Sequence, residues 1–381
     1  MRGHIEQRSK NKGTWSIKIA LGKDSSGKYK YKWYTVQGNK KDAERKLSEL
    51  LYQLDTGSYI QPGKTTVAEY LDRWLTEYVQ PNLSPRGYER YQYIALAYIK
   101  PAIGGLLLTQ VKPEHIQRCY INWSQRGLSS GTIRYHHAVI HKALQTALKW
   151  GLVALNAADG VEIPKLKQIE MQTWNETELS QFLEAAKSSQ YYELFYLALF
   201  TGMRRSELLA LRWQDIDFIL GQIYVNRGIH QLRNGSYVFT QPKSTRSRRT
   251  IALPPSAIMV LQEYHDKRQM DAAMLDLTLT DSALVFSTYD GKPLRPNTIT
   301  RAWQTIAARA GVKVIRFHDA RHTHATLMLK QGIHPKIVQE RLGHASIQMT
   351  LDTYSHVAPG LQEAAAQCFD DLVKIHVVAN Q

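Results

Sequence analysis

FHDARHTHATLMLKQGIHPKIVQERLGHASIQMTLDTYSHV, residues 317–357, holds six histidines, two arginines and one tyrosine among residues that are otherwise typical of helices. A helix does not need so many titratable side chains in order to fold. His318 and Arg321 are three residues apart, so on a helix they project from the same face. If His344 and Tyr354 lie beside them, the four side chains have the chemistry of a phosphate-binding site with a nucleophile.

The glycines and the proline of this stretch predict where its helices begin and end. Gly332 and Gly343 each tolerate the left-handed conformation in which many helices end. Pro335 suits the first turn of a helix, which we expect over residues 335–342. A further short helix is expected to begin at Ser346 and to carry the tyrosine. The stretch is therefore predicted to contain three helices.

The composition indicates a polyanionic partner. The 381 residues include 49 Lys and Arg against 33 Asp and Glu, a net charge of +16, and the isoelectric point is near 9.6. Such an excess favours nucleic acid. A membrane protein is disfavoured, because apolar runs such as Leu194–Phe200 fall far short of the ~20 residues that span a bilayer. The chain is long enough for two or three domains of ~100–200 residues each.

The N-terminal sequence and the two cysteines both favour a cytoplasmic protein. The N-terminal residues MRGHIEQRSK contain no apolar segment, so we expect no signal peptide. Cys119 and Cys368 are far apart and form no CxxC pattern, so neither a disulfide framework nor a zinc site is expected.

The first 64 residues carry 14 Lys and Arg against 6 Asp and Glu, a net of +8 and half of the excess of the whole chain. Residues 13–21 and 28–36 alternate apolar and polar residues around a turn sequence, which predicts a hairpin. Residues 40–54 have the pattern of an amphipathic helix. Lys30 and Lys32 are candidate DNA contacts, and the alternative is that these lysines are simply solvated.

Residues 56–64 are predicted to be a linker, and helices are expected from there to about Val153. The apolar periodicity places them at 66–78, 84–100, 113–125 and 132–150. Arg134 and His137 lie beside the apolar face of the last helix and are candidate DNA contacts. The aromatic residues of these helices are expected to face the core rather than to stack on bases.

A second linker at 156–167 precedes a mainly helical C-terminal region. Strands are expected at Phe218–Val225, Tyr237–Thr240 and Arg249–Leu253, as parts of one small antiparallel sheet. Arg204 stands at a helix start, where backbone amides also favour anions. Lys243 is expected on the turn between two of these strands.

These residues suit the cleavage of a phosphodiester by an oxygen nucleophile. Two arginines can neutralise the non-bridging oxygens, because a guanidinium is planar and bidentate. A lysine near the phosphate can protonate the leaving oxygen. A tyrosine hydroxyl, whose ordinary pKa is about 10, needs a base or strongly positive surroundings in order to attack.

With these residues the chain resembles the tyrosine recombinases, and within that family the phage-type and conjugative-element integrases. The resemblance rests on six positions in the order and spacing of the family, and it covers the whole chain, most strongly from Gln172 to about Pro359. The six are Arg204 in TGMRRSE, Lys243, His318 and Arg321 in HDAR, His344 in LGH, and Tyr354 in TLDTYSH.

The resemblance implies a multidomain fold with three parts. The first, residues 1–60, would be an arm-type DNA-binding domain with a three-stranded sheet and one helix. The second, residues 65–155, would be an all-α core-binding domain. The third, residues 170–381, would be a mainly-α catalytic domain with a small antiparallel sheet.

The resemblance also implies a role for each of the six residues. Tyr354 attacks the scissile phosphate and forms a 3′-phosphotyrosyl link with release of a 5′-hydroxyl. Arg204 and Arg321 bind the non-bridging oxygens, assisted by His344. Lys243 protonates the leaving oxygen, and His318 helps to accept the tyrosine proton. No cofactor and no metal is implied.

Other charged residues near these motifs have simpler interpretations. His318 and His322 form an i,i+4 pair that could bind zinc, but Asp319 stands where the metalloprotease pattern requires Glu, so a metal site is not expected. Glu207 is expected to position Arg204. The remaining arginines of both motifs are expected to contact the DNA backbone or to be solvated: Arg205, Arg246, Arg248 and Arg249, with Arg248 as a candidate DNA contact.

The function that follows is site-specific integration and excision of a mobile element. The expected partners are double-stranded DNA attachment sites, three further copies of the chain in a tetrameric synapse, a DNA-bending host factor and an excisionase, in a bacterial cytoplasm and associated with the nucleoid. Two alternatives remain open: a nicking and rejoining enzyme like the type IB topoisomerases, and a non-catalytic DNA-binding regulator. Leu361–Val378 is expected to be an amphipathic helix that docks on a neighbouring subunit or on its own domain.

Overall fold

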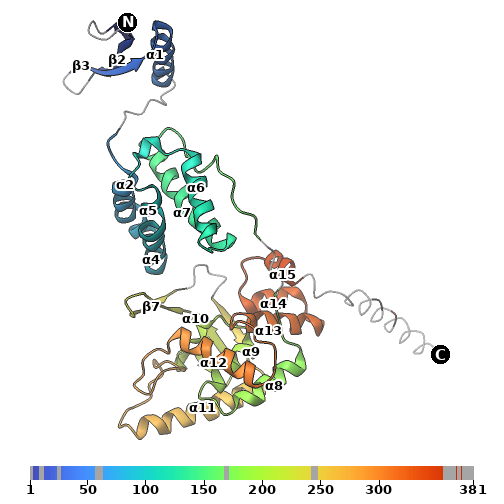
Figure 1. The fold of residues 1–381 in the computed structure, drawn as a ribbon. Helices are drawn as coiled ribbons and strands as arrows, with labels where there is room; N and C mark the ends of the chain where they lie inside the picture. The colour runs from blue at the N-terminus through green and yellow to red at the C-terminus, as the bar shows by residue number, and fades with distance from the viewer. Residues whose placement is uncertain are drawn as a thin grey trace, which may run out of the picture. The chain divides into compact units, whose positions relative to one another are not determined.

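The computed structural model describes residues 3–7, 13–23, 27–55, 63–166, 171–241 and 248–354, together with Ala366 and Asp370 (Figure 1). The chain separates into two compact units, residues 1–167 and 168–381. No helix within the described ranges is long and apolar enough to cross a membrane. Apart from Ala366 and Asp370, the predicted C-terminal helix Leu361–Val378 lies outside the described residues.

The first unit begins with a three-stranded antiparallel sheet in the order β1 (Gly3–Gln7), β2 (Thr14–Lys23), β3 (Tyr29–Gln37). Helix α1 (Lys40–Asp55) packs on one face of it, because Ile17 and Ile19 of β2 are fully buried with Leu50 of the helix. The predicted sheet with one helix is confirmed.

A helical bundle makes up the rest of the first unit (Figure 1). Val67, Tyr70, Leu71 and Trp74 recur at helical spacing and are buried in one core with residues of the later helices. The predicted all-α character is confirmed. The helices and turns are α2 (Val67–Trp74), η1 (Leu75–Val79), α3 (Gln80–Asn82), α4 (Pro85–Ile94), η2 (Ala95–Ile99), α5 (Lys100–Ile103), η3 (Leu108–Gln110), α6 (Pro113–Gln125) and α7 (Ser130–Lys149).

Two of these helices continue through a proline by widening into a π-helical turn. The π-helical segments η1 and η2 end two residues before Pro81 and Pro101, respectively. Proline lacks the N–H group of an α-helical hydrogen bond, and its ring clashes with the carbonyl four residues earlier. A wider turn relieves both problems without ending the helix.

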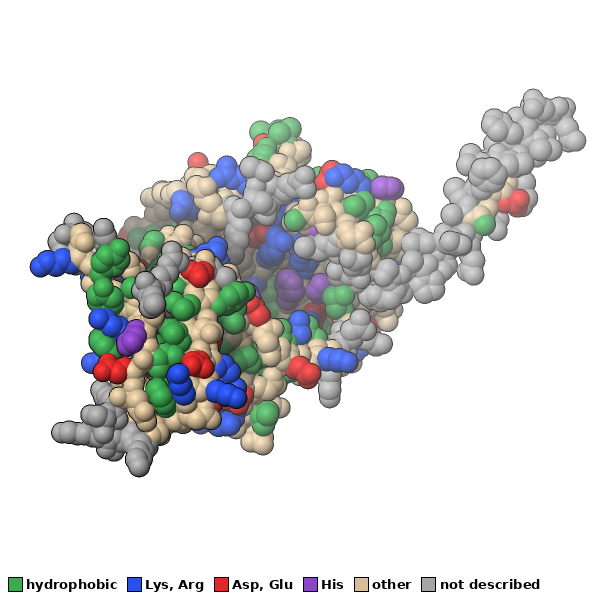
Figure 2. Space-filling model, turned by 90° about the horizontal axis from the view of Figure 1, so that it is seen from above, with side chains coloured by type: hydrophobic (Ala, Val, Ile, Leu, Met, Phe, Trp, Pro, Cys, Tyr) green, Lys and Arg blue, Asp and Glu red, His purple; other side chains and the backbone are tan. Residues whose placement is uncertain are grey.

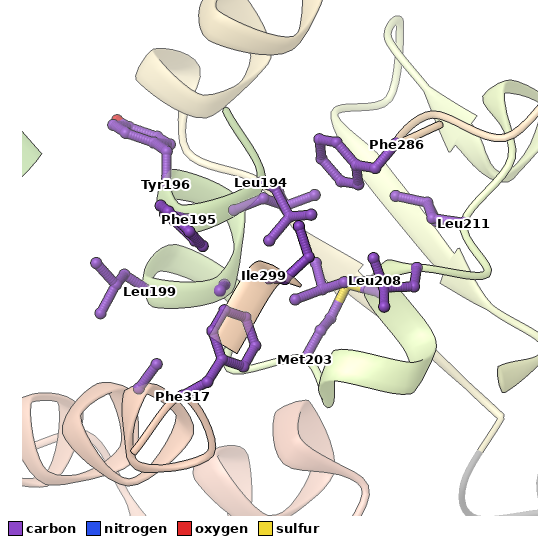
Figure 3. Close-up of a cluster of buried hydrophobic side chains, with 14 of the residues drawn as sticks. Leu194, Phe195, Tyr196, Leu199, Met203, Leu208, Leu211, Phe286, Ile299 and Phe317 are labelled. Atoms are coloured by element: carbon purple, nitrogen blue, oxygen red, sulfur yellow. The ribbon is translucent and has the colours of Figure 1, made fainter. Parts of the chain in front are cut away.

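The second unit is mainly helical, as predicted, and its core is aromatic. Trp174 stacks on Trp303 with ring centroids 4.9 Å apart, and Phe195 lies edge-on to Trp303 at 5.4 Å. Helix α9 (Tyr192–Thr201) is apolar around most of its circumference and is therefore buried in the middle of the unit. Figure 3 shows its side chains meeting Phe317, Ile299 and Leu208 from other elements.

The remaining helices of this unit surround that core. The expected helix Pro335–Leu342 is confirmed with its bounds unchanged, and the last helix begins at Ile347, one residue after the expected Ser346. The helices are α8 (Glu176–Ala186), α10 (Arg205–Leu208), η4 (Trp213–Asp215), α11 (Pro255–Ala273), α12 (Pro296–Arg309), α13 (Asp319–Lys330), α14 (Pro335–Leu342) and α15 (Ile347–Tyr354).

The prediction of one sheet in this unit is wrong in its pairing. Strands β4 (Ile216–Asp217), β5 (Gln222–Val225) and β8 (Arg249–Ala252) form one antiparallel sheet. Strand β7 (Tyr237–Thr240) instead pairs with β6 (Gly228–Gln231), which the sequence analysis missed, in a sheet of two strands.

The predicted strand Phe218–Val225 is also shorter than expected. Its first four residues form a turn, since the carboxylate of Asp217 accepts hydrogen bonds from the backbone N–H groups of Ile219 (3.0 Å) and Leu220 (2.8 Å). The side chain thus offers this backbone an alternative to the sheet ladder.

Candidate active site

Arg321 is buried in the second unit and joins three helices. Its side chain comes from the first turn of α13, and the residue is only 3% exposed. One guanidinium nitrogen donates to the carbonyl of Gly202 (2.9 Å), which ends α9, and another donates to the carbonyl of Leu342 (2.6 Å), the last residue of α14. Carbonyls at helix C-termini lack intrahelical donors and carry partial negative charge. They therefore hold the arginine in place without cancelling its charge.

These two hydrogen bonds also bring Arg204 and His344, two further predicted site residues, close to Arg321. Gly202 stands two residues before Arg204, and Leu342 stands two residues before His344. The φ angles of Gly202 (+64°) and Gly343 (+67°) are left-handed, so each glycine turns the chain sharply after its helix. Arg204 and His344 are thereby presented next to Arg321 by two helix ends.

Arg204 is the partly exposed cation of the site and is held by Glu207. The side chain of Arg204 is 35% exposed, and its Nη1 lies 2.8 Å from Oε1 of Glu207. The backbone N–H of Arg204 donates to the other carboxylate oxygen at 2.9 Å. The positioning role expected of Glu207 agrees with this geometry.

Arg249 is the second partner of the same carboxylate, and the expectation that it contacts DNA or is solvated is wrong. Its side chain is only 5% exposed, and its Nη2 lies 2.8 Å from Oε2 of Glu207. Its Nε donates to the carbonyl of Arg341 in α14 at 2.7 Å. Arg249 therefore connects β8 to both α10 and α14. Its place directly after RSR in a basic run concealed this role in the sequence.

The electrostatics of Glu207 follow from these contacts. Burial raises the pKa of its carboxyl, but the hydrogen bond and charge of Arg249, together with the charge of Arg204, outweigh burial and lower the pKa to about 2. Glu207 is thus a carboxylate at neutral pH.

His344 is a buried and neutral histidine. It is 7% exposed, and its Nδ1 lies 2.8 Å from the hydroxyl oxygen of Thr350, a fully buried residue of α15. Its backbone is fixed on both sides by Gln339, whose carbonyl accepts from N–H of His344 (3.1 Å) and whose amide donates to the carbonyl of His344 (2.8 Å). Burial, then the charges of Arg321 and Arg204, lower the pKa of the ring to about 3.

His318 lies one turn before Arg321 and keeps access to solvent. Its partial removal from water, followed by the charge of Arg321, lowers the pKa of the ring. The ring of His322 lies perpendicular to it with centroids 5.3 Å apart. No group of three or more His, Cys, Asp or Glu side chains suited to a metal ion occurs within the described part of the chain.

Two of the six predicted residues are described incompletely or not at all. Lys243 belongs to residues 242–247, which lie outside the described residues. Tyr354 ends α15, and its backbone alone is described. The structure therefore brings Arg204, His318, Arg321 and His344 into one neighbourhood. Figure 2 shows histidine side chains grouped beside Lys and Arg side chains near the centre of the view.

The candidate DNA contacts of the N-terminal sheet lie on the face of β3 that packs on α1. Lys30 and Lys32 share a face of β3 with Tyr34 and Val36, which pack toward α1. The opposite face exposes three aromatic rings. They are Tyr29 (57% exposed), Tyr31 (50%) and Trp33 (53%).

Lys18 of β2 adds a cation to this aromatic face. Its Nζ lies 4.1 Å from the ring centroid of Tyr31 and 5.2 Å from that of Trp33. The alternating KYKYKWY pattern could have identified the face, because alternate residues of a strand point to opposite sides.

The other candidate DNA contacts are already engaged within their own units. Arg134 donates to the carbonyl of Pro164 (3.2 Å), and Nδ1 of His137 lies 2.7 Å from the hydroxyl of Tyr120. Arg248 donates to the side-chain oxygen of Gln241 (2.6 Å). Their contact with DNA stays a prediction.

Comparison with known proteins places this geometry in a family. The profile of the Phage integrase family matches residues 172–360, and that of the phage integrase N-terminal SAM-like domain matches residues 66–124. A protein named Tyrosine recombinase XerC-like, from Caldanaerobacter subterraneus subsp. tengcongensis, is 31% identical over 376 residues, 94% of this chain and 96% of its own length. The ICEBs1 integrase of Bacillus subtilis is 28% identical over 291 residues, 76% of this chain and 78% of its own.

Solved structures show the same fold. The Tn1549 transposon integrase in complex with a circular intermediate DNA superposes with a TM-score of 0.69 at 19% identity, covering 80% of this chain and 100% of that one. A lambda integrase tetramer bound to a Holliday junction covers 90% of this chain and 95% of that one, with a TM-score of 0.57 and 18% identity. With two family profiles and a full-length relative in agreement, the chain belongs to the phage integrase family and is a tyrosine-type site-specific recombinase of mobile elements.

Proposed function

We propose that this recombinase cuts and rejoins DNA at attachment sites through Tyr354, with Arg204, Lys243, His318, Arg321 and His344 as the residues that make the phosphate reactive. The observation that carries the proposal is the environment of Arg321. A buried guanidinium that is bonded to two carbonyls, beside a second arginine and a neutral histidine, leaves a net positive site for an anion. A phosphodiester is the anion that fits the activity of the family.

The reaction conserves the number of phosphate ester bonds. The hydroxyl oxygen of Tyr354 attacks the scissile phosphorus, the bond from phosphorus to the 5′ oxygen breaks, and a 3′-phosphotyrosyl ester forms. His318 accepts the tyrosine proton, and Lys243 gives a proton to the leaving 5′ oxygen. In the rejoining step a 5′-hydroxyl attacks the tyrosyl ester. Lys243 regains the proton of that hydroxyl, and His318 returns a proton to the oxygen of Tyr354. No external energy source is needed, because the ester is kept in the covalent link.

Charge stabilisation is the largest contribution expected from the protein. The pentacoordinate phosphate gains negative charge on its non-bridging oxygens, where the guanidinium groups of Arg204 and Arg321 would lie. Donors that are already fixed in position need little reorganisation when the charge develops. His344, with Nδ1 held by Thr350, would present Nε2 to the same oxygens.

The division of the chain is part of the proposal. Residues 1–60 would bind an arm-type DNA sequence, residues 65–155 would grip the core site, and residues 170–381 would carry out the chemistry. The aromatic and basic face of the N-terminal sheet supports the first assignment. Lys30, Lys32, Arg134, His137 and Arg248 are retained as candidate DNA contacts.

The assembly is proposed by analogy with the solved relatives. The Tn1549 and lambda integrases were solved on DNA, the latter as a tetramer on a Holliday junction. We expect this chain to act as a tetramer on double-stranded attachment sites, with a DNA-bending host factor and an excisionase setting direction, in a bacterial cytoplasm. Deleting the residues after Gly360 should impair synapsis more than half-site binding if Leu361–Val378 docks on a neighbour. An equal loss of both would favour docking on its own domain.

A covalent-adduct assay tests the function. Labelled nicked duplexes are tiled across the DNA that flanks the gene and are incubated with the full chain, and adducts are resolved in denaturing gels. The proposal predicts an adduct at one site. Relaxation of any supercoiled plasmid without a preferred site would favour the topoisomerase-like alternative, and binding without any adduct would favour the regulator.

The two-site division is tested separately by footprinting on a long attachment site. The full chain should protect the core and separate outer sequences, whereas residues 65–381 should protect the core alone. If both proteins protect the same base pairs, the N-terminal domain adds only non-specific affinity and the two-site assignment fails.

A further inference from the structure

A basic cavity lies where the two small sheets of the second unit meet. Its volume is about 410 Å³, and it opens to solvent. Strand ends form its wall: Asn226 and Arg227 connect β5 to β6, and Thr240 ends β7. The lining residues are Arg212, Asn226, Arg227, Phe239, Thr240, Gln241 and Arg248.

The cavity is rich in hydrogen-bond donors and positively charged. Three arginines line it, and within the described part of the chain the carboxylate bonded to one of them is that of Asp215, which lies 2.6 Å from Nη1 of Arg227. Three positive charges and one negative charge leave a net of +2. The side-chain amides of Asn226 and Gln241 add further donors.

Arg212 is the least satisfied of these arginines. Its Nε is buried and has no hydrogen-bond partner among the residues that the structure describes. Its guanidinium lies 5.6 Å from the ring centroid of Phe239, which fixes one side of the group. A ligand in the cavity would meet the part of the guanidinium that lines it, whose positive charge and N–H donors favour an anion with acceptor oxygens.

We propose that this cavity binds a backbone phosphate of double-stranded DNA other than the scissile one. A phosphodiester supplies charged acceptor oxygens, which suit Arg212 and Arg248, and an open cavity suits a phosphate on the surface of a duplex. An unpaired base suits it less, since the face of Phe239 is already covered by Arg212 and a base has no charge to offset the net +2. The inference rests on the proposed function, because it takes DNA as the substrate.

We expect the phosphate bound in this cavity to lie near the scissile phosphate, because the cavity and Lys243 are close along the chain. Gln241 lines the cavity and stands two residues before Lys243, and two residues span at most about 7 Å whatever their conformation. Each DNA strand carries a phosphate about every 3.4 Å along the helix axis. We therefore expect the phosphate in the cavity to be close along the duplex to the bond that Lys243 would help to break.

The salt dependence of DNA binding tests the proposal on a duplex of arbitrary sequence, with the full chain. Each lost phosphate contact should reduce the slope of log affinity against log salt by about 1. Arg212→Gln and Arg248→Gln should each do so and should weaken binding roughly tenfold, as expected for one charge-assisted hydrogen bond. Lys267→Gln, at an exposed position on α11 that does not line the cavity, removes the same charge and should keep the slope.

A scan of neutral methylphosphonates on the duplex that forms the adduct locates the phosphate. One neutralised position near the scissile bond should weaken binding by the wild-type chain, and it should weaken binding by Arg212→Gln clearly less, because Arg248 alone still contacts that phosphate there. Arg248, which is exposed, keeps the test valid if Arg212→Gln fails to fold. Unchanged slopes in both variants would overturn the proposal, as would thermal stabilisation by inorganic phosphate with no change in DNA binding. Adduct formation by the wild-type chain is measured independently, so failure of the cavity and failure of the recombinase assignment are distinguishable.

Discussion

Nδ1 of His344 lies 2.8 Å from the hydroxyl oxygen of Thr350, and this contact joins the turn after α14 to the helix that ends in Tyr354. Both residues are buried. A hydrogen bond at one ring nitrogen determines which nitrogen carries the proton. Thr350 therefore orients the ring that is proposed to contact the phosphate, and it also sets the distance between α15 and the site.

Thr350→Val should reduce the rate of cleavage about tenfold without weakening DNA binding. Valine keeps the shape of threonine but leaves Nδ1 of a buried histidine without a partner, at a cost of about 1–3 kcal/mol. Single-turnover adduct formation measures the rate, and Thr350→Ser, which keeps the hydroxyl, is the control. A rate for the valine variant equal to that of wild type would show that Thr350 does not position His344.

Arg249→Gln should destabilise the second unit by about 3–5 kcal/mol, because it leaves the buried carboxylate of Glu207 with one cation in place of two. Adduct formation should fall as well, since the hold on Arg204 loosens. Urea denaturation measures the stability. Arg248→Gln changes the adjacent exposed arginine and should alter stability by less than about 0.5 kcal/mol. Equal stability of the two variants would contradict the connecting role of Arg249.

Arg204→Ala and Arg321→Ala should differ in stability although both lose cleavage. Each removes a charge from the transition state and should slow cleavage by at least ~10²–10³. Arg321→Ala also leaves two buried helix-end carbonyls without donors, so its midpoint of thermal unfolding should fall further. Adduct assays and thermal melts of both variants check this. An Arg321→Ala variant as stable as Arg204→Ala would argue against the anchoring of three helices by Arg321.

Stability should decrease as the pH falls below about 6.5, the ordinary pKa of histidine. The folded pKa of His344, about 3, is below that value, so the unfolded chain binds the proton first. The stabilisation is complete above pH 6.5 and is lost progressively toward pH 3. Glu207 acts in the same direction at lower pH, from about 4.5 toward its folded pKa of about 2.

His344→Gln provides the test of that pH dependence. As the pH falls from 6 to 4, the free energy of unfolding should decrease in both proteins. The decrease per pH unit should be about 1.4 kcal/mol smaller in His344→Gln, because the variant lacks the one ring that takes up a proton on unfolding. Denaturant titrations at several pH values give the slopes. Parallel slopes for the two proteins would show that His344 is not the neutral buried group described here.

Much of the catalytic unit could be predicted from its sequence because local signals and tertiary structure agree there. Pro335 and Gly343 bound α14 by backbone geometry alone, and the spacing of His318 and Arg321 follows from helical periodicity. The role of Arg249 could not be predicted in this way, since its partner Glu207 is 42 residues away in the chain. A basic run has the same composition whether its arginines are solvated or buried.

The pairing of the strands also could not be predicted from local sequence patterns. The residues of β6, GIHQ, show no clear alternation, and β7 pairs with them because the chain turns back between Leu232 and Ser236. The alternating sequence of β3 predicts lysines and aromatic residues on the strand, but it does not indicate which of the two faces packs on α1. The cavity around Arg212 forms only where two sheets meet, and no single stretch of sequence predicts that arrangement.

The measurement that tests the central claim most directly is adduct formation by Tyr354→Phe beside wild type on the same nicked, labelled site. The substitution removes one oxygen, so binding to the duplex should stay within about twofold, well under the tenfold that corresponds to 1.4 kcal/mol. Wild type should give a denaturant-resistant protein–DNA band, and Tyr354→Phe should give none. A covalent band of undiminished intensity in Tyr354→Phe would show that another residue is the nucleophile.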